Sequence, residues 1–259
     1  MIWGITFIIS RTLSAAVNIE PIADSPALLM KGEGAWIVVA DLHIGIEVQL
    51  RYAGFNIPSQ TPKMQSSLEA LASRGDRLLI LGDLKHRIPS VGYRENKEIG
   101  PFLDNLAECY KRIVVVAGNH DGGLSSILPK GVEAISGRGI NIEGDGVFHG
   151  HVWPSDVVMK SRTIVMGHVH PSVALTDSLG TRSNEKCWVR ARLNEHLVLE
   201  RYDHCPKELV IVPAFNPLLT GSPVNSSRGS MIGPFFRNGL IDSGSIRVYL
   251  LDGTNLGHP

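Results

Sequence analysis

The chain has 259 residues, a length that one α/β domain can hold, and 43% of them are hydrophobic. This composition supplies a core of ordinary size and excludes disorder over most of the chain. The 25 basic and 25 acidic residues give a formal net charge of zero, so no overall field draws the chain to nucleic acid or to an anionic membrane. A dedicated DNA-coating protein is therefore disfavoured, whereas a nuclease with a local basic groove remains open.

The cysteines and the N-terminus indicate the compartment. Cys109, Cys187 and Cys205 stand far apart, which is typical of reduced thiols in a cytoplasmic protein. The first nine residues, MIWGITFII, are apolar but follow no basic region, as a signal peptide would. They are also shorter than the roughly 20 residues that span a bilayer. We expect an apolar N-terminal strand, or a start codon assigned too early, in a soluble cytoplasmic protein with no membrane association.

Short apolar runs recur along the chain, and each is followed by polar or metal-binding side chains. The runs cover residues 36–40, 77–81, 112–117, 147–148 and 163–166. Their continuous apolar character is typical of strands buried on both faces. Helices are predicted at 62–73 and at about 95–109. This order predicts βαβ units and a mainly parallel sheet, with all five polar clusters beyond the carboxyl ends of its strands, where ligands bind in such sheets.

The residue composition and the strand pattern of the sequence change after Pro171. Strand-like pieces alternate with Gly, Ser, Asn and Pro, and they cover residues 173–176, 187–192, 209–212 and 246–251. This pattern predicts a β-rich second sheet with long loops, and a mobile segment at 220–233. We expect a single domain over 1–259, with the site motifs in 36–171 and the β-rich part in 172–259.

Seven of the ten histidines fall inside the polar clusters. They are His43, His86, His120, His149, His151, His168 and His170. A single histidine is more often structural than a ligand, but seven that follow apolar runs point to a metal site. Imidazole and carboxylate together favour Mn, Fe, Zn, Co or Ni, and the absence of cysteine from the clusters argues against a closed structural zinc site. A carboxylate shared by two such ions brings them to about 3.5–4 Å, the arrangement used for in-line phosphoryl displacement.

The polar clusters occur in a distinctive order. They are DLH (41–43), GD (82–83), GNHD (118–121), H (149) and GHVH (167–170). This ordered set resembles the calcineurin-like metallophosphoesterase family, over about residues 36–171. The resemblance implies an α/β fold of four layers, αββα, with two central mixed β-sheets and two divalent metal ions at one edge. Manganese is the expected metal, with Ni, Co, Fe or Zn as alternatives.

The resemblance also implies the role of each residue in these clusters. The first ion would be held by Asp41, His43 and His170, the second by Asn119, His149 and His168, and Asp83 would bridge them. A hydroxide between the ions would attack phosphorus in line. The catalytic residues would be Asp83 and His120, the latter near the leaving oxygen as a stabiliser or proton donor.

The second cluster departs from the family pattern. The family often places Asp or Asn shortly after GD, and this chain reads Gly82-Asp83-Leu84-Lys85-His86. The carboxylate that would orient His120 is therefore missing, and Asp121 is the candidate substitute. Lys85 and His86 are expected to contact phosphate or to support the ligands, with a purely structural role as the alternative.

Two further choices rest on the resemblance. His149 is preferred to His151 as a ligand because it follows the apolar run directly, which leaves His151 to support the ligands, to contact substrate or to serve the structure alone. The GD-x-KH form, with the tail at 213–225, resembles a prokaryotic subgroup that includes enzymes associated with DNA ligase and repair.

The expected activity is metal-dependent hydrolysis of phosphate esters, with phosphodiesters preferred and nucleic acid or nucleotides among the candidate substrates. A phosphomonoesterase or nucleotide hydrolase on the same site is one alternative. A non-catalytic protein-binding scaffold is another, disfavoured because no ligand position is replaced. A structural zinc protein is the weakest alternative. The sequence leaves the oligomeric state undecided, although the apolar residues 232–236 suggest a partner surface.

Overall fold

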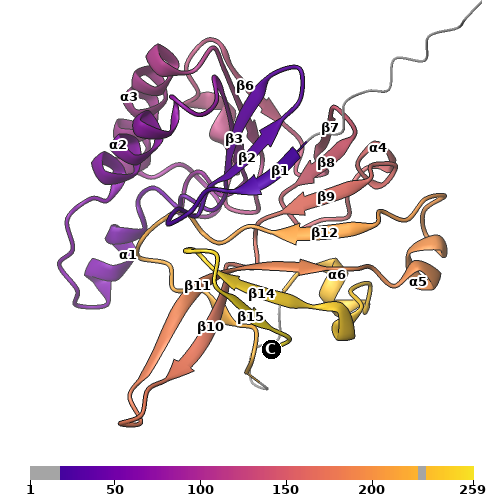
Figure 1. The fold of residues 1–259 in the computed structure, drawn as a ribbon. Helices are drawn as coiled ribbons and strands as arrows, with labels where there is room; N and C mark the ends of the chain where they lie inside the picture. Colours follow the sequence, from indigo (N-terminus) through magenta and orange to yellow (C-terminus); the bar gives the residue numbers. More distant parts are fainter. Residues whose placement is uncertain (1–17, 227–231) are drawn as a thin grey trace, which may run out of the picture.

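The structure is a computed structural model that describes residues 18–226 and 232–259. Its strands form two mixed sheets that pack face to face (Figure 1). The apolar strand expected within the first nine residues, and part of the mobile segment expected at 220–233, lie outside the described residues.

The first sheet has the strand order β1-β2-β3-β4-β5-β6. Its strands are β1 (Asn18–Pro21), β2 (Leu28–Lys31), β3 (Ala35–Val39), β4 (Arg77–Leu81), β5 (Arg112–Val116) and β6 (Val132–Ile135). β1, β2 and β3 are antiparallel neighbours, whereas β3 to β6 run parallel. The connections between β3, β4 and β5 contain α1 (Ile46–Tyr52), α2 (Thr61–Leu71) and α3 (Tyr93–Cys109). The strands and helices predicted for this region are confirmed to within two residues at most ends.

The second sheet has the strand order β13-β10-β11-β12-β9-β8-β7, and β14 and β15 extend it from β11. Its strands are β7 (Ile140–Ile142), β8 (Asp145–Phe148), β9 (Thr163–Met166), β10 (Pro171–Thr176), β11 (Arg182–Ala191), β12 (Glu208–Ile211), β13 (Ser222–Pro223), β14 (Arg247–Leu250) and β15 (Asn255–Gly257). β8, β9 and β12 run parallel, and β11 is antiparallel to β10, β12 and β14. Three short helices lie in the connections between strands of this sheet: α4 (Asp156–Met159), α5 (Glu195–Leu199) and α6 (Pro234–Arg237).

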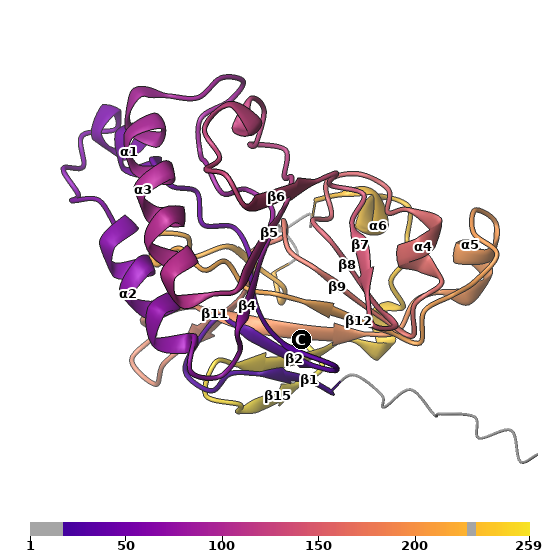
Figure 2. The ribbon, with the colours of Figure 1, turned by 90° about the horizontal axis from the view of Figure 1, so that it is seen from above.

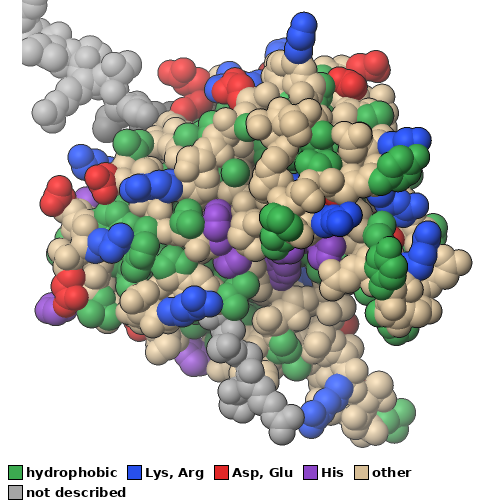
Figure 3. Space-filling model, turned by 180° about the vertical axis from the view of Figure 1, so that it is seen from behind, with side chains coloured by type: hydrophobic (Ala, Val, Ile, Leu, Met, Phe, Trp, Pro, Cys, Tyr) green, Lys and Arg blue, Asp and Glu red, His purple; other side chains and the backbone are tan. Residues whose placement is uncertain are grey.

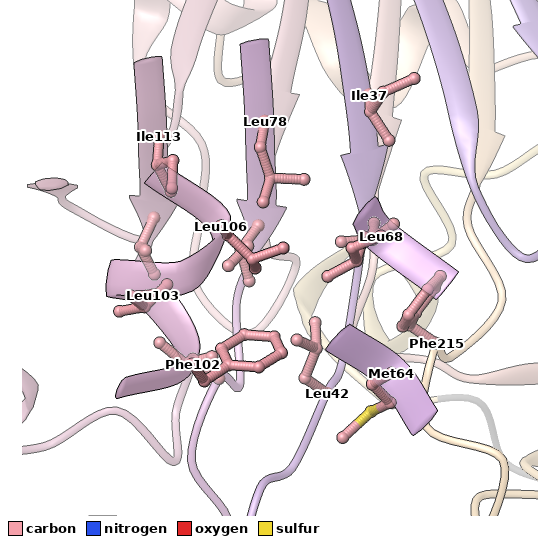
Figure 4. Packing of buried hydrophobic residues seen from close by; sticks show 14 of the residues in the cluster. Ile37, Leu42, Met64, Leu68, Leu78, Phe102, Leu103, Leu106, Ile113 and Phe215 are labelled. Carbon is pink, nitrogen blue, oxygen red and sulfur yellow. The ribbon is translucent and has the colours of Figure 1, made fainter. Parts of the chain in front are cut away.

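Three apolar layers hold the two sheets and their helices together, because alternate side chains of each buried strand point to opposite faces. Leu78 of β4 packs against α2 and α3 (Figure 4), as does Ile80. Leu79 and Leu81 face the second sheet. In the second sheet, Val165 of β9 points to the layer between the sheets, and its neighbours Ile164 and Met166 pack toward α4, α5 and α6. Burial of each such side chain contributes about 1.5–3 kcal/mol.

The order of layers is helix, sheet, sheet, helix. Figure 2 shows α1 to α3 on one side of the paired sheets and α4 to α6 on the other. The predicted αββα sandwich with two mixed sheets is confirmed. None of the helices in the described part of the chain has the length and apolar character needed to cross a bilayer.

The prediction that one mainly parallel sheet carries all five polar clusters is wrong. Three clusters follow β3, β4 and β5 of the first sheet, and two follow β8 and β9 of the second. A run buried on both faces shows that a strand is central but does not show which sheet contains it. The clusters still meet, because backbone pairing between Ala40 and Ala214 joins the two sheets at the edge where these strands end.

The apolar residues 232–236 do not form a continuous outer surface. Phe235 is buried in the layer beneath α6, where its ring lies 5.4 Å from that of Phe148. Its hydrophobic area therefore serves the core of the protein and not a partner.

Candidate metal centre

The predicted ligands lie on sharp turns directly after their strands. In the described part of the chain, seven non-glycine residues have positive φ angles, and five of them are predicted ligands. These five are Asp41 (φ 58°), His43 (φ 42°), Asp83 (φ 49°), His168 (φ 68°) and His170 (φ 46°). A left-handed conformation costs a non-glycine residue about 1–3 kcal/mol, and such strain concentrates at functional sites. The turns therefore direct these side chains toward a common point at the expense of local stability.

The first group of side chains combines Asp41, His43, Asp83 and His170. Their potential ligand atoms all lie within 4.8 Å of one another. His170 Nε2 is 3.2 Å from Asp41 Oδ1, and His43 Nε2 is 3.4 Å from Asp83 Oδ2. Both Nε2 atoms are buried and have no hydrogen-bond partner among the described residues. A buried polar atom without a partner is costly, and a cation between these nitrogens and carboxylates would remove that cost.

The second group combines Asp83, His149 and His168, again with ligand atoms within 4.8 Å. His149 Nε2 lies 3.4 Å from Asp83 Oδ2 and 3.3 Å from Asn119 Oδ1. The other ring nitrogen of His149, Nδ1, donates to the carbonyl of Leu81 at 2.9 Å. A carbonyl behind the ring fixes the proton on Nδ1 and leaves Nε2 free to bind a metal.

Asp83 belongs to both groups. Its Oδ2 atom lies 3.4 Å from His43 Nε2 on one side and 3.4 Å from His149 Nε2 on the other, while its Oδ1 atom accepts the backbone N–H of His120 at 2.9 Å. All seven predicted ligands therefore meet at one place, with a carboxylate between two sets of nitrogen and oxygen donors. This donor set suits two borderline or hard divalent ions.

The local electrostatics prepare these groups for a cation. Burial lowers the pKa of His43 to about 3 and that of His168 to about 4, so both rings are neutral at physiological pH and keep a lone pair. Burial also lowers the pKa of His149, but contacts with Asp83 and Asp41 outweigh burial and raise it to about 9. Burial raises the pKa of Asp83, but His149 and His43 outweigh it and hold that carboxyl ionised, well below its usual range.

The ring of His120 is oriented by a backbone carbonyl. Its Nδ1 atom donates to the carbonyl oxygen of His86. Asp121, the candidate substitute for the missing carboxylate, instead accepts the backbone N–H groups of Lys85 at 3.1 Å and Gly118 at 2.8 Å. Asp121 therefore braces the two turns that carry Asp83 and Asn119, and a neutral acceptor faces His120.

The other candidates lie behind or beside the ligands. Lys85 is fully buried, and its Nζ donates to the carbonyl oxygens of Arg87 and, at 3.5 Å, Ser90, so it supports the 86–91 loop. His86 contacts His43, with 3.2 Å between their Nδ1 atoms. The ring of His151 lies 5.2 Å from that of His149 and 6.1 Å from that of His168.

Two residues that sequence reasoning did not single out brace the first ligand turn. Asn216 donates through Nδ2 to the carbonyl of Leu42 at 2.7 Å, between the ligands Asp41 and His43. Lys186 donates to the carbonyl oxygens of Ala214 at 2.7 Å and Asn216 at 2.6 Å. The sequence motif at 213–225 contains Asn216, but it does not indicate that this residue contacts Leu42.

A groove of about 810 Å³ runs from His86 and His120 along α1 and the start of α3. Its walls include Arg51, Arg87 and Arg94, together with the tyrosines Tyr52 and Tyr93, which are 90% and 75% exposed. Figure 3 shows histidine side chains gathered in the middle of one face, with lysine and arginine side chains around them. The site is thus open to solvent on a locally basic surface.

Comparisons with known proteins agree with this geometry. The sequence matches the calcineurin-like phosphoesterase family over residues 36–219. The nuclease MPE of Pseudomonas putida is 19% identical, with a TM-score of 0.50 over 92% of this chain and 100% of that one. YfcE, a phosphoesterase from E. coli, is 20% identical, with a TM-score of 0.38 over 86% of this chain and 96% of that one. A sequence search of curated proteins found no match.

The nuclease MPE is similar to this chain at an identity that speaks only to the fold. The family match is broader evidence, because it spans most of the chain and contains every predicted ligand from Asp41 to His170. With the αββα sandwich and the two side-chain groups joined by Asp83, the conclusion is direct: this chain belongs to the calcineurin-like phosphoesterase family.

Proposed function

We propose that the protein is a phosphoesterase that depends on two divalent metal ions and prefers phosphodiesters, with nucleic acid or nucleotides as its substrate class. The observation that carries this proposal is the position of Asp83, whose Oδ2 atom lies 3.4 Å from the Nε2 atom of a histidine in each group. A carboxylate shared in this way is the central element of a two-metal hydrolytic site.

The ligand sets follow from the two groups. Asp41, His43 and His170 would hold one ion, Asn119, His149 and His168 the other, and Asp83 both; manganese is the expected metal. When bound, the ions supply a nucleophilic water at neutral pH and neutralise charge on the phosphoryl oxygens. The protein supplies the geometry, and its strained turns and buried braces hold the donors in place before any metal arrives.

His120 is the proposed group for the leaving oxygen. Because its Nδ1 donates to the carbonyl of His86, its Nε2 atom is available for the substrate. Its backbone N–H bonds to Asp83 Oδ1, so the ring is held next to the shared carboxylate. From this position His120 would stabilise the leaving oxygen or give it a proton. A carbonyl orients the ring but adds no negative charge, so His120 lacks the stronger support that a carboxylate gives an imidazolium.

The groove supports the diester preference. A diester has a substituent on each side of the phosphorus, and the groove of about 810 Å³, which begins at His86 and His120 beside the predicted ligands, has room for one of them. Arginine guanidinium groups pair well with phosphate oxygens, and exposed tyrosine rings offer stacking surfaces for bases.

The test starts from metal-free protein, assayed with bis-p-nitrophenyl phosphate and p-nitrophenyl phosphate in the presence of Mn, Ni, Co, Zn or Mg. We expect metal-dependent turnover, faster on the diester. In Asp83→Asn, turnover should fall by more than about 100-fold, because the shared ligand loses its charge and removal even of a ligand's supporting partner costs about 10- to 100-fold. Asp104→Asn, an exposed change on α3, is the matched control.

Two outcomes would redirect the proposal. Faster turnover of the monoester would replace the diesterase with a phosphomonoesterase on the same site. Failure of the purified protein to bind any of these metals would leave the non-catalytic scaffold as the better description.

A further inference from the structure

A line of three side chains connects the surface helix α1 to the metal centre. Gln49, exposed on α1, places its Oε1 atom 2.5 Å from His86 Nε2. The other nitrogen of His86, Nδ1, lies 3.2 Å from His43 Nδ1. His43 in turn directs its Nε2 atom toward Asp83 Oδ2, at 3.4 Å. Each histidine uses one ring nitrogen for each of its two contacts, so the nitrogen that carries the proton in His86 determines which nitrogen carries it in His43.

The hydrogen-bond chemistry of the first partner sets the direction of the line. An amide oxygen accepts but does not donate, so His86 must carry a proton on Nε2. In a neutral imidazole the other nitrogen is then an acceptor, and His86 Nδ1 accepts a proton from His43 Nδ1. His43 therefore bears its proton on Nδ1, which leaves a lone pair on Nε2, the atom that faces the shared carboxylate.

The opposite arrangement conflicts with the surroundings of His43. If His86 donated from both nitrogens, His43 would accept at Nδ1 and carry its proton on Nε2. His86 would then be a cation. His43 Nε2 is buried and makes no hydrogen bond of good geometry, although Asp83 Oδ2 lies 3.4 Å away, so its N–H would be poorly satisfied. A lone pair at the same position needs only a cation.

We propose that Gln49 and His86 are positioning residues that hold His43 in its Nδ1–H form and thereby present Nε2 to the first metal ion. This inference rests on the proposed function, because it gives the free nitrogen of His43 a metal to bind. For His149, the carbonyl of Leu81 does the same work from inside the sheet. His43 depends instead on two side chains that line the groove, so the groove wall and the metal centre share one hydrogen-bonded line.

A third metal ion is the competing use of these atoms, since potential ligand atoms of His43, His86 and His120 also lie within 4.8 Å of one another. That ion would require His43 to bind metal through both ring nitrogens and therefore to lose both protons. It would also have three imidazoles and no carboxylate. The hydrogen-bonded line from Gln49 through His86 to His43, here called the relay, requires none of this. The number of ions bound per chain distinguishes the relay from a third metal site.

The first measurement is made on metal-free protein labelled with ¹⁵N at histidine. A long-range ¹H–¹⁵N spectrum reports which ring nitrogen carries the proton. We expect His43 to be protonated on Nδ1 and bare on Nε2 in the wild type, and to lose this preference in Gln49→Leu and His86→Phe. His86→Asn, whose amide oxygen takes the place of Nδ1 as acceptor, should restore it. A wild-type His43 protonated on Nε2, or one unchanged in both Gln49→Leu and His86→Phe, would overturn the proposal.

The second measurement is the affinity for Mn²⁺ by titration calorimetry. Loss of a partner that orients a metal-binding histidine weakens metal binding by about 10- to 100-fold, so we expect that loss in Gln49→Leu and His86→Phe and a smaller one in His86→Asn. All three variants keep the backbone carbonyl that faces His120. His196→Phe, an exposed histidine on α5, is the matched control.

The outcomes separate the relay from the proposed function. Two ions bound by the wild type and undiminished affinity in His86→Phe would refute the relay and leave the phosphoesterase intact. Three ions in the wild type and two in His86→Phe would replace the relay with a third metal site. If the wild type binds no metal while His43 shows the expected tautomer, the proposed function fails and the hydrogen-bonded line stands. Gln49 is exposed, so Gln49→Leu keeps the test valid if His86→Phe does not fold, as circular dichroism would show.

Discussion

At the scale of single residues, the metal centre consists of side chains whose burial would be unfavourable without a cation. Asp41, Asp83 and His149 are almost fully buried, and His43 Nε2 and His170 Nε2 have no hydrogen-bond partner among the described residues. The two carboxylates compensate in the metal-free protein by holding a proton on His149, whose pKa rises to about 9 despite its burial. That proton occupies the place of a positive charge that a metal ion would supply.

This arrangement predicts the release of a proton when metal binds. Below a pH of about 9 the metal-free His149 is protonated, and it must become neutral to act as a ligand. We expect about one proton released per chain from this residue at pH 7, and an affinity for Mn²⁺ that rises with pH up to about 9. Calorimetry in buffers of different ionisation enthalpy measures the release directly. No dependence of the binding heat on the buffer would show that His149 is already neutral.

At the scale of the elements, the turns after the strands are packed so closely that they leave no room for a methyl group. A Cβ atom on Gly118 would lie 2.0 Å from Asp83 Oδ1 and 2.3 Å from the backbone nitrogen of Asp83. The turn after β5 therefore presses directly on the turn after β4. Gly118 is required because two ligand-bearing turns meet there.

Gly118→Ala should therefore abolish turnover by moving Asp83. We expect activity to fall by at least about 100-fold, in line with the loss of a shared ligand, together with lower metal content. Gly244→Ala is the matched control, since its Cβ would meet Asp242 Oδ1 at an ordinary 3.5 Å. Wild-type activity in Gly118→Ala would mean that the turns are looser than this packing requires.

A second element-scale contact joins segments that are distant in sequence. Asn216, in the loop after β12, is fully buried and donates to the carbonyl of Leu42 at 2.7 Å, so Asn216→Ala leaves a buried carbonyl without its donor. The expected loss in the free energy of unfolding is about 1–3 kcal/mol, measured by urea denaturation. Asn225→Ala should cost less, because its two bonds to Ala174 are exposed and water replaces them. Equal effects of the two changes would contradict the bracing role of Asn216.

At the scale of the whole molecule, the neutral net charge conceals a local basic surface beside the metal centre. Arg51 and Arg87 come from α1 and from the loop after β4, and they meet only because these segments pack at the same edge of the first sheet. The 86–91 loop holds its shape through Lys85 beneath it and through the buried carboxylate of Glu95, which accepts the N–H groups of Arg87 at 2.5 Å and of Gly92.

The double change Arg51→Ala, Arg87→Ala tests the groove as a binding surface for an extended substrate. We expect the KM for a single-stranded oligonucleotide to rise by about 10-fold, with a weaker dependence on salt, because fewer phosphates are neutralised. Arg182→Ala, on an exposed hairpin, serves as the control. An unchanged KM and an unchanged salt dependence would show that the bound oligonucleotide extends from the metal centre along a different surface.

The sequence alone predicted the central strands, the two long helices and the layers that the structure shows, and it named seven side chains that the structure brings together. Continuous apolar runs such as 77–81 are typical of strands buried on both faces, and the family motif assigned side chains to the turns that follow. Sequence reasoning missed the short elements β1, β2 and α1, because their four to seven residues show too little periodicity to distinguish them from loops.

Only the tertiary structure decided which sheet contains β8 and β9, and which groups lie behind the ligands. Both decisions depend on contacts between residues that are far apart in the chain, such as Asn216 with Leu42, or on a backbone carbonyl whose identity no side chain reveals, such as that of His86 behind His120. Local sequence determines what a strand or turn can present. The packing of the two sheets determines what each side chain meets, because that choice is made by the whole core and not by any single segment.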